Sequence, residues 1–491
     1  MLSTCSWMNA FGFRLLSLIS LMSIAPSSAA PATRSFPGAH SARKPARAYH
    51  RRRRSQGIVP RPVGADTALA NDRESARRGC GRRRPGERGL TGRRGDRRLP
   101  GAADRPSPAT RTRRLAMRIT GVEARLYRIP PAVQIQDSIQ RISHWEFIVT
   151  TVATDAGVTG TGFAYTLGLG GTAVRELVGT YLAPLVIGAD PVDVERLWKR
   201  CWWELHALGS GGMSRFALAT IDIALWDILA QKAGVPLYRL LGGFRDRIPA
   251  YGSGINAHLD GEPLLDQMRG FLAQGYRSVK MKVGRDDPQE DVERVAAVRR
   301  LIGSGIPLML DANQKWTAAE AIRRVGHLKP FDPYWIEEPL LADDRAGHAH
   351  VRQATGVAMA VGETLYTRYE FADYIRAGAV DVVQADIPRV GGFTEWMKIA
   401  KLAESFNLPV APHFMMELSV HALCAVPNGL ILEDLQGGSL TDLGVLAEPI
   451  RVVRGEIAPP DRPGHGIVFD PAALRRYEVT GTVTGVTATR T

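Results

Sequence analysis

The chain contains little cysteine, four residues in 491. Only Cys201 and Cys424 lie beyond residue 116, and they are far apart in the sequence. Isolated cysteines of this kind exclude a disulfide framework and the short spacings of a zinc site. We therefore expect both to be buried in the core of a protein from a reducing compartment, the cytoplasm.

Long hydrophobic runs are absent beyond residue 30, which excludes a membrane-spanning helix and a membrane partner there. Residues 1–30 differ, because Arg14 precedes the apolar run Leu15–Met22 and small residues follow as far as Ala30. That order resembles a secretory signal. Export is therefore an alternative to a cytoplasmic location, although such a run also arises by chance in an unselected upstream segment.

Acidic residues are scarce in the first 116 residues, which hold 25 Lys or Arg against 6 Asp or Glu, whereas the remainder holds 38 against 43. Because residues 31–116 show no apolar periodicity, we expect a disordered Arg/Pro/Gly-rich extension. A nucleic-acid-binding arm is the alternative function. Few aromatic residues and no accompanying fold disfavour it, so no nucleic acid partner is expected. Translation from Met117 would remove the extension entirely.

The rest of the chain is rich in alternating apolar patterns. Residues 117–245 begin with strand-like segments such as Phe147–Val152 and continue with helical ones, Ala173–Val186 and Phe216–Ala233, which predicts an α+β capping domain. Residues 246–449 alternate short apolar runs with amphipathic helices such as Asp291–Ile302 and Thr317–His327.

Eight strands are expected in that second region: Ile248–Gly252, Ser278–Val283, Pro307–Leu310, Tyr334–Ile336, Ala358–Val361, Val380–Val383, Pro409–Ala411 and Leu430–Leu432. Eight strand-plus-helix units predict a TIM-like α/β barrel rather than an open sheet. Residues 450–491 contain Gly- and Pro-rich turns and a short helix, and we expect them to leave the barrel and return to the capping domain.

Three carboxylates, Asp311, Glu337 and Glu363, recur at equal intervals, each at the end of a predicted barrel strand. The ends of successive parallel strands converge on one mouth of a barrel. Three oxygen donors at that mouth predict the ligands of a hard divalent cation, for which we expect Mg2+.

Lys280 and Lys282 lie on one face of the second predicted strand, because strand side chains alternate. Two adjacent ammonium groups lower each other's pKa, and a lysine near neutrality can take a proton. A solvated pair at the barrel rim is the alternative.

Further polar residues follow other strands. Asn313 could bind a substrate hydroxyl or carboxylate, and Asp386 could fix the tautomer of His413 at the neighbouring strand end. Glu433, if its surroundings keep it protonated, could donate a hydrogen bond to a developing oxyanion.

These residues together resemble the enolase superfamily, mandelate racemase subgroup. The resemblance runs from Met117 to about Tyr477 and includes Lys280-Met281-Lys282, Asp311-Ala312-Asn313, Trp335-Ile336-Glu337-Glu338-Pro339, Gly362-Glu363, Asp386 with Arg389-Val390-Gly391-Gly392, Pro412-His413 and Glu433. It implies a capping domain over a modified (β/α)7β barrel, usually in a homo-oligomer. It also implies Mg2+ held by Asp311, Glu337 and Glu363.

For the chemistry, the resemblance implies that Lys282, tuned by Lys280, is the base on one face of a small carboxylate substrate. It implies that His413, paired with Asp386, is the acid or base on the other face, with Lys280, Asn313 and Glu433 touching substrate. The metal and hydrogen-bond donors would stabilise an enediolate intermediate.

Two outcomes follow loss of the α-proton: expulsion of a β-hydroxyl, or return of the proton from the opposite face. Segments around Asp386 and His413 resemble talarate/galactarate dehydratases, although Ser419 stands where those enzymes carry a further histidine. We therefore expect an acid-sugar dehydratase that forms a 2-keto-3-deoxy acid, with a 2-hydroxy-acid racemase or epimerase as the alternative.

Substrate selectivity is expected from two loops of the capping domain, about Pro130 to His144 and Gly162 to Gly171. Their polar members are candidates to touch the far end of a substrate: Gln134, Gln136, Arg141, His144 and Tyr165.

Overall fold

The computed structural model describes residues 117–480 and 483–484. The extension 1–116, with its signal-like start and its arginine runs, lies outside these residues. In the part of the chain that the structure covers, none of the helices combines the length and apolar character needed to cross a bilayer.

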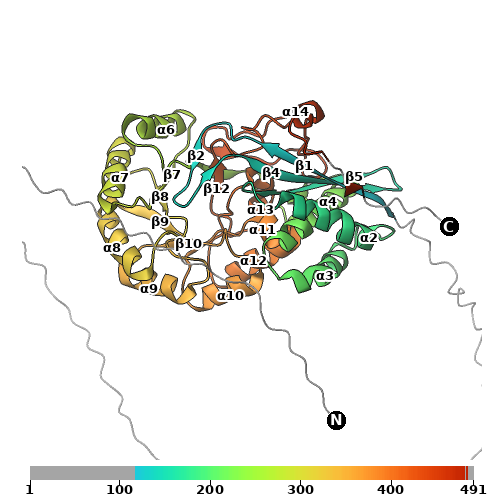
Figure 1. Ribbon diagram of the computed structural model, residues 1–491, viewed down its shortest axis with the longest axis horizontal. Coiled ribbons are helices and arrows are strands. Elements are labelled where there is room, and N and C mark those ends of the chain that lie inside the picture. The colour runs from blue at the N-terminus through green and yellow to red at the C-terminus, as the bar shows by residue number, and fades with distance from the viewer. Residues whose placement is uncertain (1–116, 481–482, 485–491) are drawn as a thin grey trace, which may run out of the picture. The chain divides into compact units, whose positions relative to one another are not determined.

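The capping region is an antiparallel sheet of order β14-β1-β4-β5 with helices packed against it. Its strands are β1 (Ile119–Ile129), β4 (Trp145–Thr154), β5 (Thr159–Thr166) and β14 (Val483–Thr484), the last from the end of the chain. A small hairpin, β2 (Ile135–Gln136) and β3 (Arg141–Ile142), lies between β1 and β4. Figure 1 shows this region beside the ring of barrel helices.

The helices of the capping region are α1 (Gly171–Glu176), the π-helix Leu177–Leu182, α2 (Ala183–Val186), α3 (Val194–Leu205), the 3-10 helix His206–Leu208, α4 (Met213–Ala233) and α5 (Leu237–Leu241). Helix α4 packs closely on β5, where a Cβ atom at Gly162 would lie 1.9 Å from the Thr220 carbonyl oxygen. Glycine is therefore required there for the helix to approach the sheet.

The second sheet is parallel, in the order β11-β10-β9-β8-β7-β6-β12. Its strands are β6 (Ile248–Ser253), β7 (Val279–Lys282), β8 (Leu308–Asp311), β9 (Pro333–Glu337), β10 (Met359–Val361), β11 (Val382–Val383) and β12 (Leu432–Leu435). Val410 closes the ring, because it bridges Val383 on one side and Gly429 on the other. The short strand β13 (Glu456–Ile457) pairs antiparallel with β6.

Helices cover the outside of this barrel (Figure 1). They are α6 (Gly261–Ala273), α7 (Pro288–Ile302), α8 (Ala318–Leu328), the 3-10 helix Lys329–Phe331, α9 (Arg345–Thr355), α10 (Arg368–Arg376), α11 (Ile387–Val390), α12 (Phe393–Ser405) and α13 (Met416–Ala425). Helix α14 (Pro471–Arg475), in the C-terminal segment, lies beside β1 of the capping region (Figure 1). The predicted α/β barrel with an α+β cap is thus confirmed.

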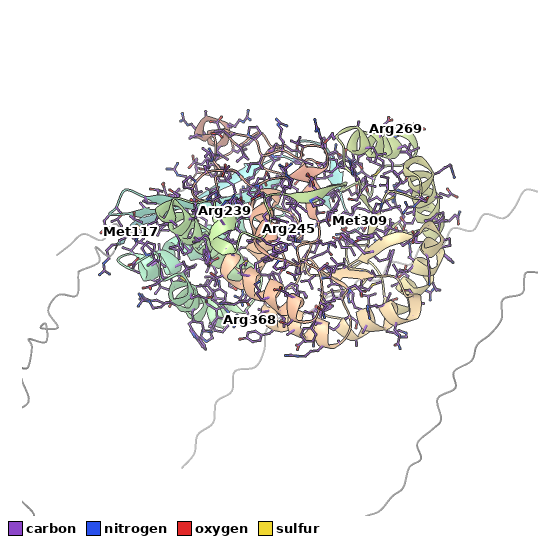
Figure 2. All side chains as sticks on the ribbon, turned by 180° about the vertical axis from the view of Figure 1, so that it is seen from behind. Met117, Arg239, Arg245, Arg269, Met309 and Arg368 are labelled. Carbon is purple, nitrogen blue, oxygen red and sulfur yellow. The ribbon has the colours of Figure 1, made fainter. Side chains whose placement is uncertain are left out.

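The barrel interior is filled by one layer of side chains from different strands: Tyr251, Met309, Trp335, Ala360, Val382 and Ala411. Figure 2 labels Met309 inside the ring of helices. Because inward-facing residues alternate, the next inward positions are polar, such as Asp311 two residues after Met309 and Glu337 two residues after Trp335. The apolar layer is therefore the floor on which a polar site rests.

Candidate active site

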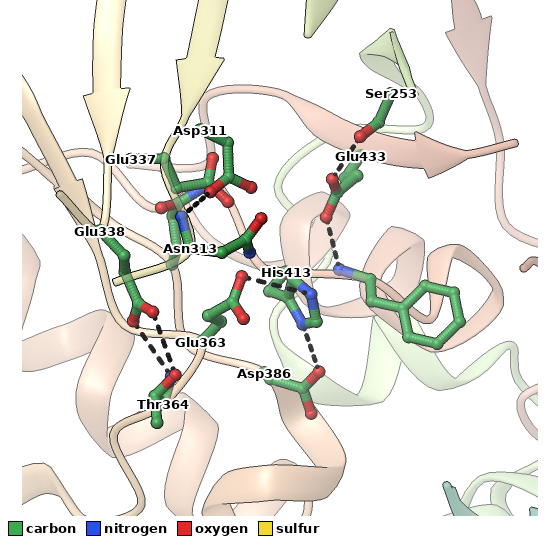
Figure 3. Close-up of polar contacts among 12 residues, drawn as sticks. Ser253, Asp311, Asn313, Glu337, Glu338, Glu363, Thr364, Asp386, His413 and Glu433 are labelled. Carbon is green, nitrogen blue, oxygen red and sulfur yellow. Dashed lines mark hydrogen bonds and ion pairs between the residues drawn. The ribbon is translucent and has the colours of Figure 1, made fainter. Parts of the chain in front are cut away.

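Three carboxylates meet above this floor. Asp311 ends β8, Glu337 ends β9, and Glu363 follows β10 by two residues. One oxygen from each lies within 4.8 Å of the others, and all three residues are buried. Figure 3 shows Asp311 beside Glu337, with Glu363 facing them from the next loop. The register explains the arrangement, because Asp311 and Glu337 are paired across adjacent parallel strands.

Gly362 allows Glu363 to reach this cluster. Its φ angle of 148° is rarely adopted by other residues, and a Cβ atom there would lie 2.9 Å from backbone atoms of Gln384. A glycine at this point lets the chain turn sharply after β10 and directs the following carboxylate inward.

Both lysines of β7 point into the cluster and are buried. The Lys280 ammonium lies 2.8 Å from Glu337 Oε1 and 2.6 Å from Glu433 Oε1, and the Lys282 ammonium donates to Asp311. Each lysine is thus held by at least one carboxylate, which excludes the alternative of a solvated pair at the rim.

The predicted lowering of the lysine pKa values is wrong for this arrangement. Burial lowers the pKa of Lys282, and Lys280 lowers it further, as the alternation predicted. The Asp311 carboxylate opposes both, and the pKa of Lys282 lies above its usual value. The pKa of Lys280 is raised in the same way, because Glu337 and Glu433 outweigh its burial.

The cluster carries more negative than positive groups. Asp311, Glu337, Glu363 and Glu433 surround the two ammonium groups, and burial together with Asp311 raises the pKa of Glu337 to about 8. A divalent cation would balance this surplus charge, and carboxylate oxygens are the ligands that Mg2+ prefers. The donor set of Asp311, Glu337 and Glu363 therefore fits Mg2+.

Glu433 does not behave as the predicted hydrogen-bond donor. Its carboxylate accepts hydrogen bonds from Ser253 Oγ (2.7 Å) and from the Phe414 amide (2.9 Å), in addition to the Lys280 ion pair (Figure 3). Burial would raise its pKa, but Lys280 dominates and the pKa of Glu433 lies well below its usual value. The prediction of a protonated carboxyl is therefore wrong, because three donors stabilise the ionised form.

His413 and Asp386 form the expected pair. His413 Nδ1 lies 2.9 Å from Asp386 Oδ2, and its Nε2 lies 3.5 Å from Glu363 Oε2. Asp386 also caps α11, because its Oδ1 accepts the Arg389 amide (2.8 Å). Burial lowers the pKa of His413, but Glu363 and the hydrogen bond to Asp386 outweigh this, so the pKa lies above its usual value.

Tyr165, a predicted substrate contact, hydrogen-bonds to this pair and also lines the cavity. The hydroxyl of this β5 residue donates to Asp386 Oδ2 (2.7 Å) and accepts from Arg389 Nε (3.1 Å). Burial raises the pKa of Tyr165 well above its usual value, so the hydroxyl stays protonated. The capping sheet thereby touches the acid–base pair directly.

Most of these residues line a single cavity. Its barrel wall is formed by Ile255, Lys282, Asn313, Glu363, Arg389, His413, Phe414, Glu433 and Leu435, and its cap wall by Asp137, Ile142, Trp145, Tyr165 and Leu167. Asn313 lies here as predicted, and its Oδ1 has no hydrogen-bond partner among the described residues. That buried acceptor is available to a substrate hydroxyl.

The other predicted cap contacts lie elsewhere. Gln134, Gln136, Arg141 and His144 do not line the cavity, whereas Asp137 and Ile142 from the same loop do. Sequence reasoning missed Asp137 and Arg389. The strands of the hairpin that carries Asp137 have only two residues each, too few to show a pattern of alternating side chains. Arg389 belongs to the segment Arg389-Val390-Gly391-Gly392, but the sequence alone indicates no contact for it.

Two family models match this chain. Residues 122–242 match the mandelate racemase / muconate lactonizing enzyme N-terminal domain, and residues 264–473 match the enolase C-terminal domain-like family. The chain therefore belongs to the enolase superfamily, in its mandelate racemase subgroup, and the family is one of enzymes.

Individual relatives agree in fold and differ in activity. A 3,6-anhydro-alpha-L-galactonate cycloisomerase of Streptomyces coelicolor is 41% identical over 362 residues, covering 74% of this chain and 99% of the relative. The structure of a racemase from the same species, with bound magnesium, has a TM-score of 0.71 at 41% identity, covering 74% of this chain and 100% of that one.

An L-talarate dehydratase from Polaromonas sp. JS666, complexed with Mg and L-glucarate, has a TM-score of 0.71 at 34% identity, covering 75% of this chain and 100% of that one. The relatives thus include dehydratases, cycloisomerases and racemases, and solved ones contain magnesium, in agreement with the predicted Mg2+ site.

Proposed function

We propose that this protein is a Mg2+-dependent enzyme that removes the proton α to the carboxylate of an acid sugar and expels the oxygen on the β-carbon. The product is a 2-keto-3-deoxy acid, and the favoured reaction is dehydration of an aldonate or aldarate. The observation that carries the proposal is that Lys282 and His413 line one cavity together with Glu363 of the carboxylate cluster.

Asp311, Glu337 and Glu363 would hold the metal. When bound, Mg2+ supplies positive charge that stabilises the enediolate formed after proton loss. Lys280, fixed between Glu337 and Glu433, adds a buried positive charge beside the same substrate carboxylate.

The proton transfers fall to two side chains. Lys282 takes the α-proton in its neutral form, which it reaches only after losing the proton that the Asp311 carboxylate stabilises, and the electron pair of the C–H bond forms the enol double bond. His413 gives its Nε2 proton to the departing β-oxygen as the C–O bond breaks, so that water leaves. Asp386 holds His413 through Nδ1, which directs Nε2 toward the cavity. The enol then becomes the 2-keto product.

A second candidate differs only in the leaving group. In a 3,6-anhydro acid sugar the β-oxygen belongs to a ring, so the same elimination opens the ring and loses no water. The 41% identity to a cycloisomerase favours this candidate. Racemisation or epimerisation, in which His413 returns a proton to the α-carbon from the opposite face, is the remaining alternative.

A substrate panel tests the proposal. The purified protein with Mg2+ is incubated with aldonates, aldarates, 3,6-anhydroaldonates and mandelate, and 2-keto-3-deoxy acids are measured. We expect keto product from at least one acid sugar, and ring-opened product without water loss if the second candidate holds. No keto product across the panel, with exchange of the mandelate α-proton for solvent deuterium, would contradict the elimination.

The outer parts of the chain are tested by truncation. We expect a variant starting at Met117 to fold into the regions 117–245, 246–449 and 450–491, to form a homo-oligomer and to keep full turnover. Nucleic acid binding by the extension instead predicts salt-dependent binding that the truncation abolishes. Sedimentation, turnover and a binding titration at two salt concentrations distinguish these outcomes.

A further inference from the structure

The turn between β2 and β3 places one carboxylate on the cap wall of the cavity. Asp137 is 7% exposed, and its Oδ1 accepts the amides of Ile139 (2.8 Å) and Gln140 (2.7 Å). Among residues 117–480, none donates a hydrogen bond to its Oδ2. One oxygen thus organises the turn, and the other remains an acceptor at the cavity.

The hairpin is fixed to the barrel. The Gln136 amide donates to the Ile255 carbonyl (3.0 Å), the Ala257 amide donates to the Gln136 carbonyl (2.9 Å), and Ser138 Oγ donates to the Val283 carbonyl. These contacts hold the turn at the ends of β6 and β7, beside Lys282. The pKa of Asp137 lies above its usual value, because burial outweighs the opposing effect of the nearby Lys282 ammonium.

Among residues 117–480, the cap wall offers no cation to a second substrate carboxylate. Apart from Asp137, the cap residues at the cavity are the apolar Ile142 and Leu167, Trp145, whose buried indole N–H has no hydrogen-bond partner among the described residues, and Tyr165, whose hydroxyl is already bonded to Asp386. Arg141 is exposed and is not part of the cavity.

The substrate has only one direction in which to extend. Its reacting carboxylate lies at the cluster, and beneath the cluster the apolar layer with Met309 and Trp335 fills the barrel. The far end of an acid sugar must therefore reach the cap wall.

We propose that Asp137 selects acid sugars with a single carboxylate, whose far end is an uncharged hydroxyl or ether, and rejects dicarboxylates. This inference rests on the proposed elimination and names its substrate class. A hydroxyl at the far end would donate to Asp137 Oδ2, and the ring carbons would pack on Ile142 and Trp145. A second carboxylate would instead meet a like charge on the cap wall, whose other members carry no charge, and like charges brought together at a binding surface are unfavourable.

Matched substrate pairs test the inference. Each pair is an aldonate and the aldarate of the same configuration, which differ only in CH2OH or carboxylate at the last carbon. We expect kcat/KM of the wild-type enzyme to favour the aldonate by about 100-fold, the size of a like-charge clash of a few kcal/mol. An aldarate turned over as fast as its partner would overturn the inference and leave the elimination intact. Turnover of no pair, and of no 3,6-anhydroaldonate, would instead count against the elimination.

The variant Asp137→Asn removes the charge without disturbing the turn, because the amide oxygen of asparagine can still accept hydrogen bonds from the Ile139 and Gln140 amides. A change in substrate preference would then not be caused by misfolding. We expect it to reduce the aldonate preference at least about 10-fold, chiefly by improving aldarates. Asp137→Ser, which also favours turns, should do the same. Asp155→Asn is the matched control, since Asp155 accepts the Arg118 amide in an exposed hairpin turn of the cap. An unchanged preference in both folded Asp137 variants would overturn the inference.

Discussion

The barrel wall of the cavity and its cap wall are built from different kinds of structure. On the barrel wall, Lys282 and the carboxylate cluster lie at the ends of parallel strands, where Lys282 pairs with Asp311 and Asp311 pairs with Glu337. On the cap wall, Asp137 comes from a hairpin of two-residue strands, and Tyr165 comes from the end of strand β5. We therefore assign the shared reaction chemistry to the barrel wall and propose that substrate selection depends on the cap wall, whose hairpin is attached by a few hydrogen bonds.

The largest expected effect is on the barrel wall. Glu337→Gln removes a charge that contacts Lys280 and that we assign to the metal, so we expect kcat to fall by more than about 1,000-fold and Mg2+ affinity to be lost. Titration calorimetry with Mg2+ measures the binding independently of turnover.

The neighbouring Glu338→Gln is the matched control. Glu338 accepts from Thr364 N (3.3 Å) and Thr364 Oγ1 (3.0 Å), and Figure 3 shows it directed away from the Asp311–Glu337 pair. We expect it to keep Mg2+ binding. If Glu337→Gln bound Mg2+ like the wild type, or if exhaustive chelation left turnover unchanged, the assignment of the cluster as a metal site would be wrong.

The next effect separates the two proton-transfer groups. We expect Lys282→Ala and His413→Ala each to lower kcat by about 100- to 1,000-fold, the usual contribution of a positioned acid or base. The two should differ in a partial reaction, because His413→Ala keeps Lys282 and should still exchange the α-proton of a bound substrate with solvent deuterium. Lys315→Ala, which removes an ammonium 3.5 Å from the Asp286 carboxylate near the surface, is the control. Substantial turnover in the Lys282→Ala, His413→Ala double variant would refute a two-group site.

The same division explains what the sequence predicts and what it does not. Asp311, Glu337 and Lys282 were located from the period of strand-plus-helix units and from two-residue alternation, both of which follow from backbone geometry. Cap contacts have no such period. Gln136 was chosen for its polarity, yet its neighbour Asp137 is the one at the cavity, because a single-residue step in a hairpin reverses the side-chain direction.

The sequence also predicts the wrong charge states for two side chains of the site. The pKa directions of Lys282 and Glu433 depend on partners that converge from several strands, such as Asp311 from β8 and the Phe414 amide. The spacing of residues along one strand does not show which partners the other strands bring to a side chain. The outcome was a raised pKa for the lysine and an ionised Glu433, opposite in both cases to the value expected from local sequence.

Tyr165 provides a smaller test of how the cap reaches the acid–base pair. Tyr165→Phe keeps the ring but removes the hydroxyl that donates to Asp386, so we expect kcat to fall by about 10-fold, as when an outer hydrogen-bond partner is lost, with little change in KM. Tyr238→Phe is the control, since its hydroxyl donates to Asp246 outside the cavity (2.9 Å). In a His413→Ala background, Tyr165→Phe should add no further loss. A full additional loss there would show that Tyr165 acts elsewhere.

The smallest expected effect is at the attachment of the hairpin. Ser138→Ala removes the hydrogen bond from Ser138 Oγ to the Val283 carbonyl, one of a few contacts that fix the turn to the barrel. A single neutral hydrogen bond of this kind corresponds to a change of about 3-fold, which we expect as a rise in KM and a weaker aldonate preference at unchanged kcat. Ser143→Ala, in the same segment but exposed and hydrogen-bonded to the neighbouring His144, should change neither. A fall in kcat instead would mean that the hairpin also positions Lys282, and the two walls would then not be separable.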